Sequence, residues 1–80
     1  MYTITTTNKF DKSLKLCKKR NYDLSLLQVV IDLLQKEGKL PQKYKPHKLS
    51  GNYKDCWECH IKPDWLLVWK QNDTEIIYFF

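Results

Sequence analysis

Residues 47–69 read HKLSGNYKDCWECHIKPDWLLVW and carry the signals on which the predicted fold depends. Residues 55–61 are expected to be extended, residues 62–64 form a turn around a proline, and residues 65–71 are typical of a strongly apolar strand. Successive side chains of a strand point to opposite faces. In the strand at residues 55–61, the more apolar side chains are expected to face the helices; they are Trp57, Cys59 and Ile61. The open face of the sheet is then expected to carry Cys56, Glu58 and His60.

Two helices are predicted upstream of this segment. Asn8 is placed to cap the first, whose apolar stripe consists of Phe10, Leu14 and Cys17. The second covers residues 24–37, with Asp23 at its N-cap and Gly38 just past its end. Its buried side is expected to consist of Leu24, Leu27, Val30, Ile31 and Leu34.

Short strands are predicted at both ends of the chain. Residues 2–6 alternate and are rich in β-branched side chains, and residues 75–80 form the last strand after a two-residue loop at Asn72 and Asp73. The order is β-α-α-β-β-β, which predicts the α+β class, with a helical hairpin packed on a small antiparallel sheet. With 80 residues, one domain over residues 1–80 is expected.

The charge distribution points to an acidic partner. The net charge of +5 is ordinary for a small domain, but residues 39–54 contain five lysines and no acidic residue. Such a run is typical of nucleic-acid binding, where Tyr53 can also stack on a base. The candidate RNA-binding residues are Lys39, Lys43, Lys45, Lys48, Lys54 and Tyr53.

The N-terminus has neither a basic segment nor an apolar run, so no secretory signal and no membrane span are expected. The three cysteines are an odd number, and they are expected to stay reduced in a cytoplasmic protein.

The sequence Cys56-Trp57-Glu58-Cys59-His60 matches the C-x-x-C-H pattern of covalent haem attachment. In a strand, however, Cys56 and Cys59 point to opposite faces, which also disfavours a dithiol or a zinc site. No metal ion and no cofactor are therefore predicted.

A cluster of acid–base groups is predicted instead. Glu58 and His60 are neighbours on the open face, His47 lies just before their strand, and Asp64 lies in the turn just after it. Imidazoles suit both proton transfers of RNA cleavage by its own 2′-hydroxyl, and lysines stabilise the charged transition state. The four groups are therefore predicted to be catalytic.

The segments His47-Lys48-Leu49-Ser50-Gly51, Glu58-Cys59-His60-Ile61 and Pro63-Asp64-Trp65-Leu66-Leu67-Val68 resemble the YafQ-type branch of the RelE/ParE toxin superfamily. The resemblance implies a RelE-like fold and a toxin of a type II toxin–antitoxin system that cleaves mRNA with the ribosome. It places proton transfer and substrate positioning at His47, Glu58, His60 and Asp64. It also implies a cognate antitoxin over the basic surface, and it is compatible with a dimer or a heterotetramer containing the antitoxin.

Two departures from the family pattern bear on activity. Family members continue with a tail such as R-x-G-T/S-H-x-x-L-F, and the 80 residues end at Phe80 without it. An arginine often precedes the acidic residue, and here that position is Trp57. Both are expected to weaken cleavage.

Two other functions remain open. One is the ParE-like arm of the superfamily, whose members inhibit gyrase by binding. The other is a non-enzymatic module that binds RNA or protein. The histidine and carboxylate cluster favours the nuclease.

Overall fold

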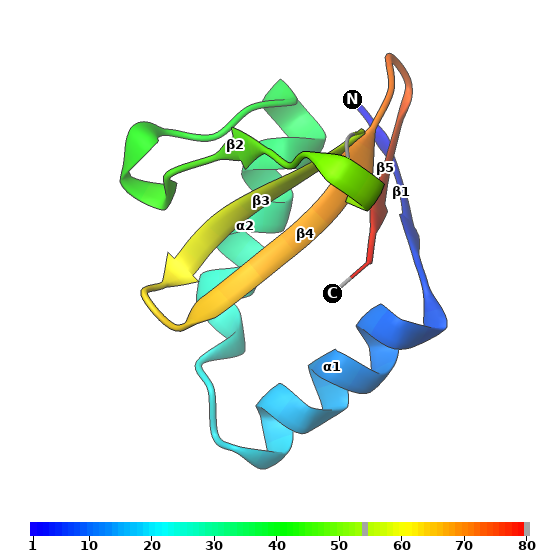
Figure 1. The fold of residues 1–80 in the computed structure, drawn as a ribbon. Helices are drawn as coiled ribbons and strands as arrows, with labels where there is room; N and C mark the ends of the chain where they lie inside the picture. The colour runs from blue at the N-terminus through cyan, green and yellow to red at the C-terminus, as the bar shows by residue number, and fades with distance from the viewer. Residues whose placement is uncertain (54, 80) are drawn as a thin grey trace.

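The computed structural model describes residues 1–53 and 55–79, without the side chain of Tyr53 (Figure 1). The RNA-binding prediction for Lys54 therefore lies outside the described residues, as does the placement of Phe80 at the end of the last strand. In chain order the elements are β1 (Thr3–Thr6), α1 (Asn8–Lys19), α2 (Leu24–Glu37), the 3-10 helix η1 (Gln42–Tyr44), β2 (His47–Lys48), the 3-10 helix η2 (Gly51–Tyr53), β3 (Cys56–Lys62), β4 (Trp65–Gln71) and β5 (Glu75–Tyr78).

Within the described residues, the sheet has five strands in the order β1-β5-β4-β3-β2. The α+β class is confirmed, but the sheet is mixed rather than antiparallel, because β1 pairs with β5 in parallel. No tight turn joins these two strands, so no local signal fixes their direction. The other difference is β2, a strand of two residues inside the predicted loop, which pairs antiparallel with β3.

The second helix begins and ends where the sequence predicts. Asp23 accepts a hydrogen bond from Ser25 N, and Gly38 takes the left-handed conformation at φ 71°. The prediction of Asn8 as the cap of α1 is wrong by one residue, since Thr7 is the N-cap and its Oγ1 accepts from Phe10 N at 3.1 Å. Thr7 Oγ1 also lies 3.2 Å from Tyr78 O, so the same hydroxyl ties the start of α1 to the sheet.

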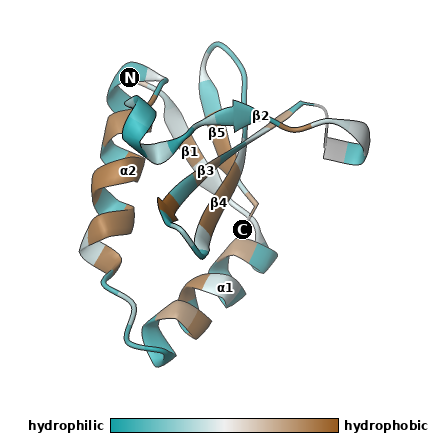
Figure 2. Cartoon of the chain, turned by 60° about the vertical axis from the view of Figure 1, so that its left-hand side comes forward, coloured by the Kyte–Doolittle hydropathy of each residue, from teal (hydrophilic) through white to brown (hydrophobic). Residues whose placement is uncertain are grey.

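The hydrophobic core lies between the helices and one face of the sheet. Figure 2 shows hydrophobic residues concentrated on α2 and β4, whereas β2 is hydrophilic. Cys59 is fully buried in this core, and Trp57 and Ile61 pack against it, so the predicted alternation along β3 is confirmed. The opposite face is only partly open, because Cys56 and Val68 are buried there.

One polar group in the core has no partner among the described residues: the hydroxyl of Tyr78, whose ring lies 5.5 Å from that of Phe10. Burial raises the pKa of this phenol. An unpaired buried hydroxyl costs free energy that a hydrogen atom does not.

Tyr78→Phe is therefore expected to raise the free energy of unfolding by about 1 kcal/mol, measured by urea denaturation. Tyr22→Phe, at a partly exposed ring, is the control with little expected change, and a loss of stability in Tyr78→Phe would show that the hydroxyl is bonded.

Candidate functional site

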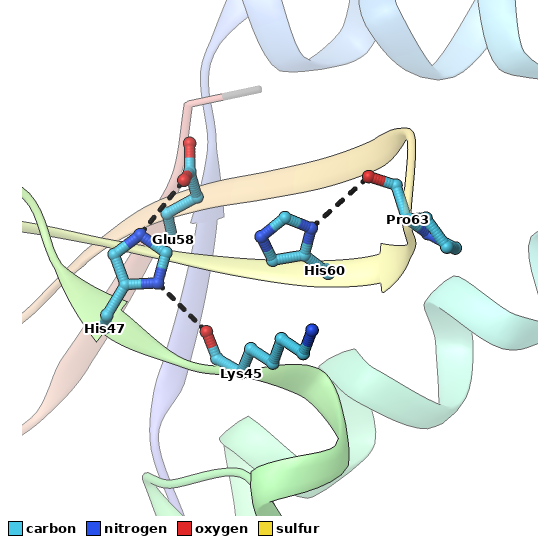
Figure 3. A network of polar contacts seen from close by, with 5 residues as sticks. All are labelled: Lys45, His47, Glu58, His60 and Pro63. Atoms are coloured by element: carbon cyan, nitrogen blue, oxygen red, sulfur yellow. Dashed lines mark hydrogen bonds and ion pairs between the residues drawn. The ribbon is translucent and has the colours of Figure 1, made fainter.

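The strongest polar contact of the site joins His47 to Glu58. The two residues lie opposite each other in the β2–β3 register, and His47 Nε2 is 3.1 Å from Glu58 Oε1 (Figure 3). Directly paired cross-strand residues lie closer than residues two apart on one strand. The carboxylate therefore orients His47 rather than His60, the neighbour that the spacing along the strand favoured. The Glu58 side chain is 20% exposed and that of His47 is 48% exposed, so water screens the charges of this pair in part.

Both ring nitrogens of His47 face hydrogen-bond acceptors. Nε2 faces the Glu58 carboxylate, and Nδ1 lies 3.0 Å from the carbonyl oxygen of Lys45. A neutral imidazole carries one N–H and an imidazolium carries two. Only the protonated ring can donate to both acceptors, so this surrounding suits a proton donor.

His60 has one anchored nitrogen. Its Nδ1 lies 3.4 Å from the carbonyl oxygen of Pro63, a long contact in which the nitrogen must be the donor. When Nδ1 carries the proton, Nε2 of the neutral ring has a free lone pair. The ring centroids of His60 and His47 are 6.3 Å apart, close enough for both rings to contact one phosphate group. His47, Glu58 and His60 thus come together as predicted.

Asp64 lies elsewhere. It is exposed in the β3–β4 turn and borders a pocket with Tyr22, Asp23 and Trp65 beside the start of α2. No contact joins it to either histidine within the part of the chain that the structure describes. The predicted group of four is therefore a group of three with Asp64 at one side.

The predicted RNA-binding lysines divide into two sets. Lys43 and Lys45 border a pocket beside His60, together with Lys62, which is not among the predicted RNA-binding residues. Lys48 instead packs over the Trp57 ring at 5.6 Å from its centroid, on the other face of the sheet. Lys39 also lies near Trp57, so residues 39–48 do not form one cationic surface.

The cysteines do not converge. Cys59 lies in the core, where burial first and the nearby Glu58 charge second raise the pKa of its thiol to about 12. Cys56 is on the opposite face of β3, so the two sulfurs point apart as the alternation predicts. Over residues 1–53 and 55–79, no three His, Cys, Asp or Glu side chains are grouped closely enough to hold a metal ion. In the same residues, no helix has the length and apolar character needed to cross a membrane.

Comparison with known proteins gives a consistent result. Residues 2–79 match the sequence model of a family described as the bacterial toxin of type II toxin–antitoxin system, YafQ. The mRNA interferase toxin YafQ of Escherichia coli K12 is 35% identical over 71 residues, which are 88% of this chain and 77% of the relative.

Two solved structures are also similar to the chain. The E. coli DinJ–YafQ complex matches with a TM-score of 0.91 and 31% identity, over 99% of this chain and 89% of that chain. A metal-bound toxin from Helicobacter pylori matches with a TM-score of 0.89 and 44% identity, over 99% and 90% of the two chains.

Proposed function

The chain belongs to the YafQ family of bacterial type II toxins, and from this premise we propose that it is an endoribonuclease that cleaves mRNA on the ribosome without a metal ion. The observation that supports this proposal is the placement of His47, Glu58 and His60 on one face of the sheet beside a lysine-lined pocket. Related toxins named mRNA interferases support it further. They also disfavour the gyrase-inhibiting alternative.

The proposed reaction is transfer of the phosphate to the neighbouring 2′-oxygen. His60 Nε2 removes the proton of the 2′-hydroxyl, and the resulting oxygen attacks phosphorus. The bond from phosphorus to the 5′-oxygen breaks, and the His47 imidazolium gives that oxygen a proton. The products are a 2′,3′-cyclic phosphate and a 5′-hydroxyl. Glu58 Oε1 accepts from the Nε2–H of the His47 imidazolium, and the positive charge of Lys43 and Lys45 at the adjoining pocket attracts the anionic RNA.

The remaining predicted residues have supporting roles in this proposal. Asp64 follows Pro63, whose carbonyl anchors His60, so it is suited to positioning substrate rather than to proton transfer. Lys39 and Lys48 would contact RNA further from the cleaved bond, beside Trp57. The contributions of Tyr53 and Lys54 remain predictions.

A cognate antitoxin is the proposed protein partner. The DinJ–YafQ complexes support this assignment, because the toxin in them is similar to this chain over nearly its whole length. An acidic antitoxin segment placed over His60 and its lysines would block access of RNA.

The direct test is cleavage of mRNA by the purified protein in a ribosome-containing translation mixture. Cleavage is expected, and it should persist when trace transition metals are removed with a chelator that leaves the ribosomal magnesium in place. Fragments with a 5′-hydroxyl and a cyclic phosphate cannot be ligated until their ends are treated, so failure of the untreated fragments to ligate identifies these ends. Intact mRNA at high protein concentration would contradict the endoribonuclease assignment, and rescue by zinc or copper would contradict metal independence.

A further inference from the structure

A pocket of about 280 Å³ lies beside His60. Lys43 and Lys45 reach it from the segment around η1, and Lys62 reaches it from the end of β3. Among the described residues that line it, none is acidic. None of the three ammonium groups forms an ion pair in the described part of the chain. Lys43 Nζ lies 5.1 Å from the centroid of the Tyr44 ring, and Lys62 also borders the pocket that contains Asp23 and Asp64. Three cations around one hollow suit a phosphate group.

Lys45 joins this pocket to the acid–base group. Its backbone has φ 50°, in the left-handed region that a lysine seldom adopts, and its carbonyl oxygen accepts from His47 Nδ1. Figure 3 shows its side chain extending from that carbonyl toward the side of the site where His60 lies. A strained backbone at such a position is typical of functional sites. Lys45 therefore contacts His47 through its carbonyl oxygen and borders the pocket beside His60.

The hydrogen bonds of the two rings indicate which histidine acts as the acid and which as the base. His47 faces acceptors at both nitrogens, which suits the acid that protonates the leaving 5′-oxygen. No hydrogen bond to His60 Nε2 is formed within residues 1–53 and 55–79, which suits the base at the 2′-hydroxyl. The pocket borders His60, and it therefore lies on the side of the nucleotide that carries the attacking hydroxyl.

We propose that Lys43, Lys45 and Lys62 bind the phosphate on the 5′ side of the nucleotide whose 2′-hydroxyl attacks. This inference rests on the proposed endoribonuclease function and adds a substrate requirement to it: recognition extends one phosphate upstream of the cleaved bond. Because Lys43, Lys45 and Lys62 all border this one pocket, the phosphate on the 3′ side of the cleaved dinucleotide is expected to gain no contact with them.

The test uses three 2′-deoxyadenosine dinucleotides that cannot be cleaved: one without a terminal phosphate, one with a 5′-phosphate and one with a 3′-phosphate. Each is titrated at low ionic strength into the isotope-labelled protein, and the affinity is read from the NMR shifts of the His60 and lysine side-chain signals. The 5′-phosphate is expected to tighten binding about tenfold, as charge-assisted hydrogen bonds do, and the 3′-phosphate to have little effect. Lys62→Ala should remove the advantage of the 5′-phosphate.

Lys15→Ala is the matched control, because it removes the same charge from the exposed surface of α1 and should leave that advantage unchanged. Equal affinities for the three dinucleotides, a preference for the 3′-phosphate, or equal effects of Lys62→Ala and Lys15→Ala would each overturn the inference. None of these outcomes bears on whether mRNA is cleaved, so the upstream phosphate site and the endoribonuclease function can fail separately.

Discussion

Replacing His60 by alanine is expected to lower the rate of mRNA cleavage by about 10²–10⁴-fold, the usual contribution of a general acid or base. His47→Ala should have an effect of the same size, because each histidine carries one of the two proton transfers in the proposed reaction. The double variant should lose little more than either single variant, since groups that act as a unit are not additive. Cleavage rates are compared at equal protein concentration, and far-UV circular dichroism verifies the fold.

Glu58→Gln provides the graded comparison. An amide oxygen can still accept from His47 Nε2, but it gives no charge stabilisation to the imidazolium. We therefore expect a smaller loss of rate than in His47→Ala. Asp73→Ala, in the exposed loop before β5, is the control with an unchanged rate. A folded His60→Ala variant that cleaves at the rate of the unsubstituted protein would remove His60 from the mechanism.

The second large effect concerns the core. Trp69→Ala is expected to lower the free energy of unfolding by about 3–5 kcal/mol. Trp69 is 2% exposed, its ring stacks on that of Trp57 at 6.3 Å, and its Nε1 donates to Gln71 Oε1. Gln71 in turn donates to Gly38 O at the end of α2, so the substitution also loosens the link between sheet and helix. An 80-residue domain has a total stability of about 4–12 kcal/mol, and much of it would be lost.

Leu66→Ala is the matched comparison, because Leu66 lies on the same strand but is 40% exposed. Its cost should stay near or below about 1 kcal/mol. Urea denaturation followed by tryptophan fluorescence and by circular dichroism measures both variants. Equal losses in the two variants would mean that the face of β4 that carries Trp69 is not the principal core.

The elements that could be predicted from sequence are those with local signals. Asp23 and Gly38 determine the ends of α2 through a side-chain cap and a left-handed residue, and the turn at residues 62–64 determines the β3–β4 hairpin. The parallel pairing of β1 with β5 could not be predicted, because it joins the two ends of the chain with no connecting turn. The cap of α1 was misplaced because Thr7 and Asn8 are both good capping residues, and the choice depends on the contact of Thr7 with Tyr78.

The candidate site also combines features that local sequence signals predict with features that depend on long-range pairing. Residue types and strand alternation were enough to predict that His47, Glu58 and His60 lie near one another. The pairing of His47 with Glu58 could not be predicted, because it depends on the register of β2. This strand has only two residues, and the lysines, prolines and glycine around it give no alternating pattern that would indicate a strand. Lys62 was missed because it follows the lysine run by eight positions and joins Lys43 and Lys45 only through the fold.

The shortness of β2 has a consequence for control of the proposed activity. His47 is held at the outer edge of the sheet by a strand of two residues, whereas Glu58 and His60 are on a seven-residue strand with partners on both sides. Separation of β2 from β3 breaks few hydrogen bonds and exposes little of the core, so it needs far less free energy than global unfolding. A bound protein that separated this edge segment from β3 would move His47, the proposed proton donor, away from Glu58 and leave the rest of the molecule folded.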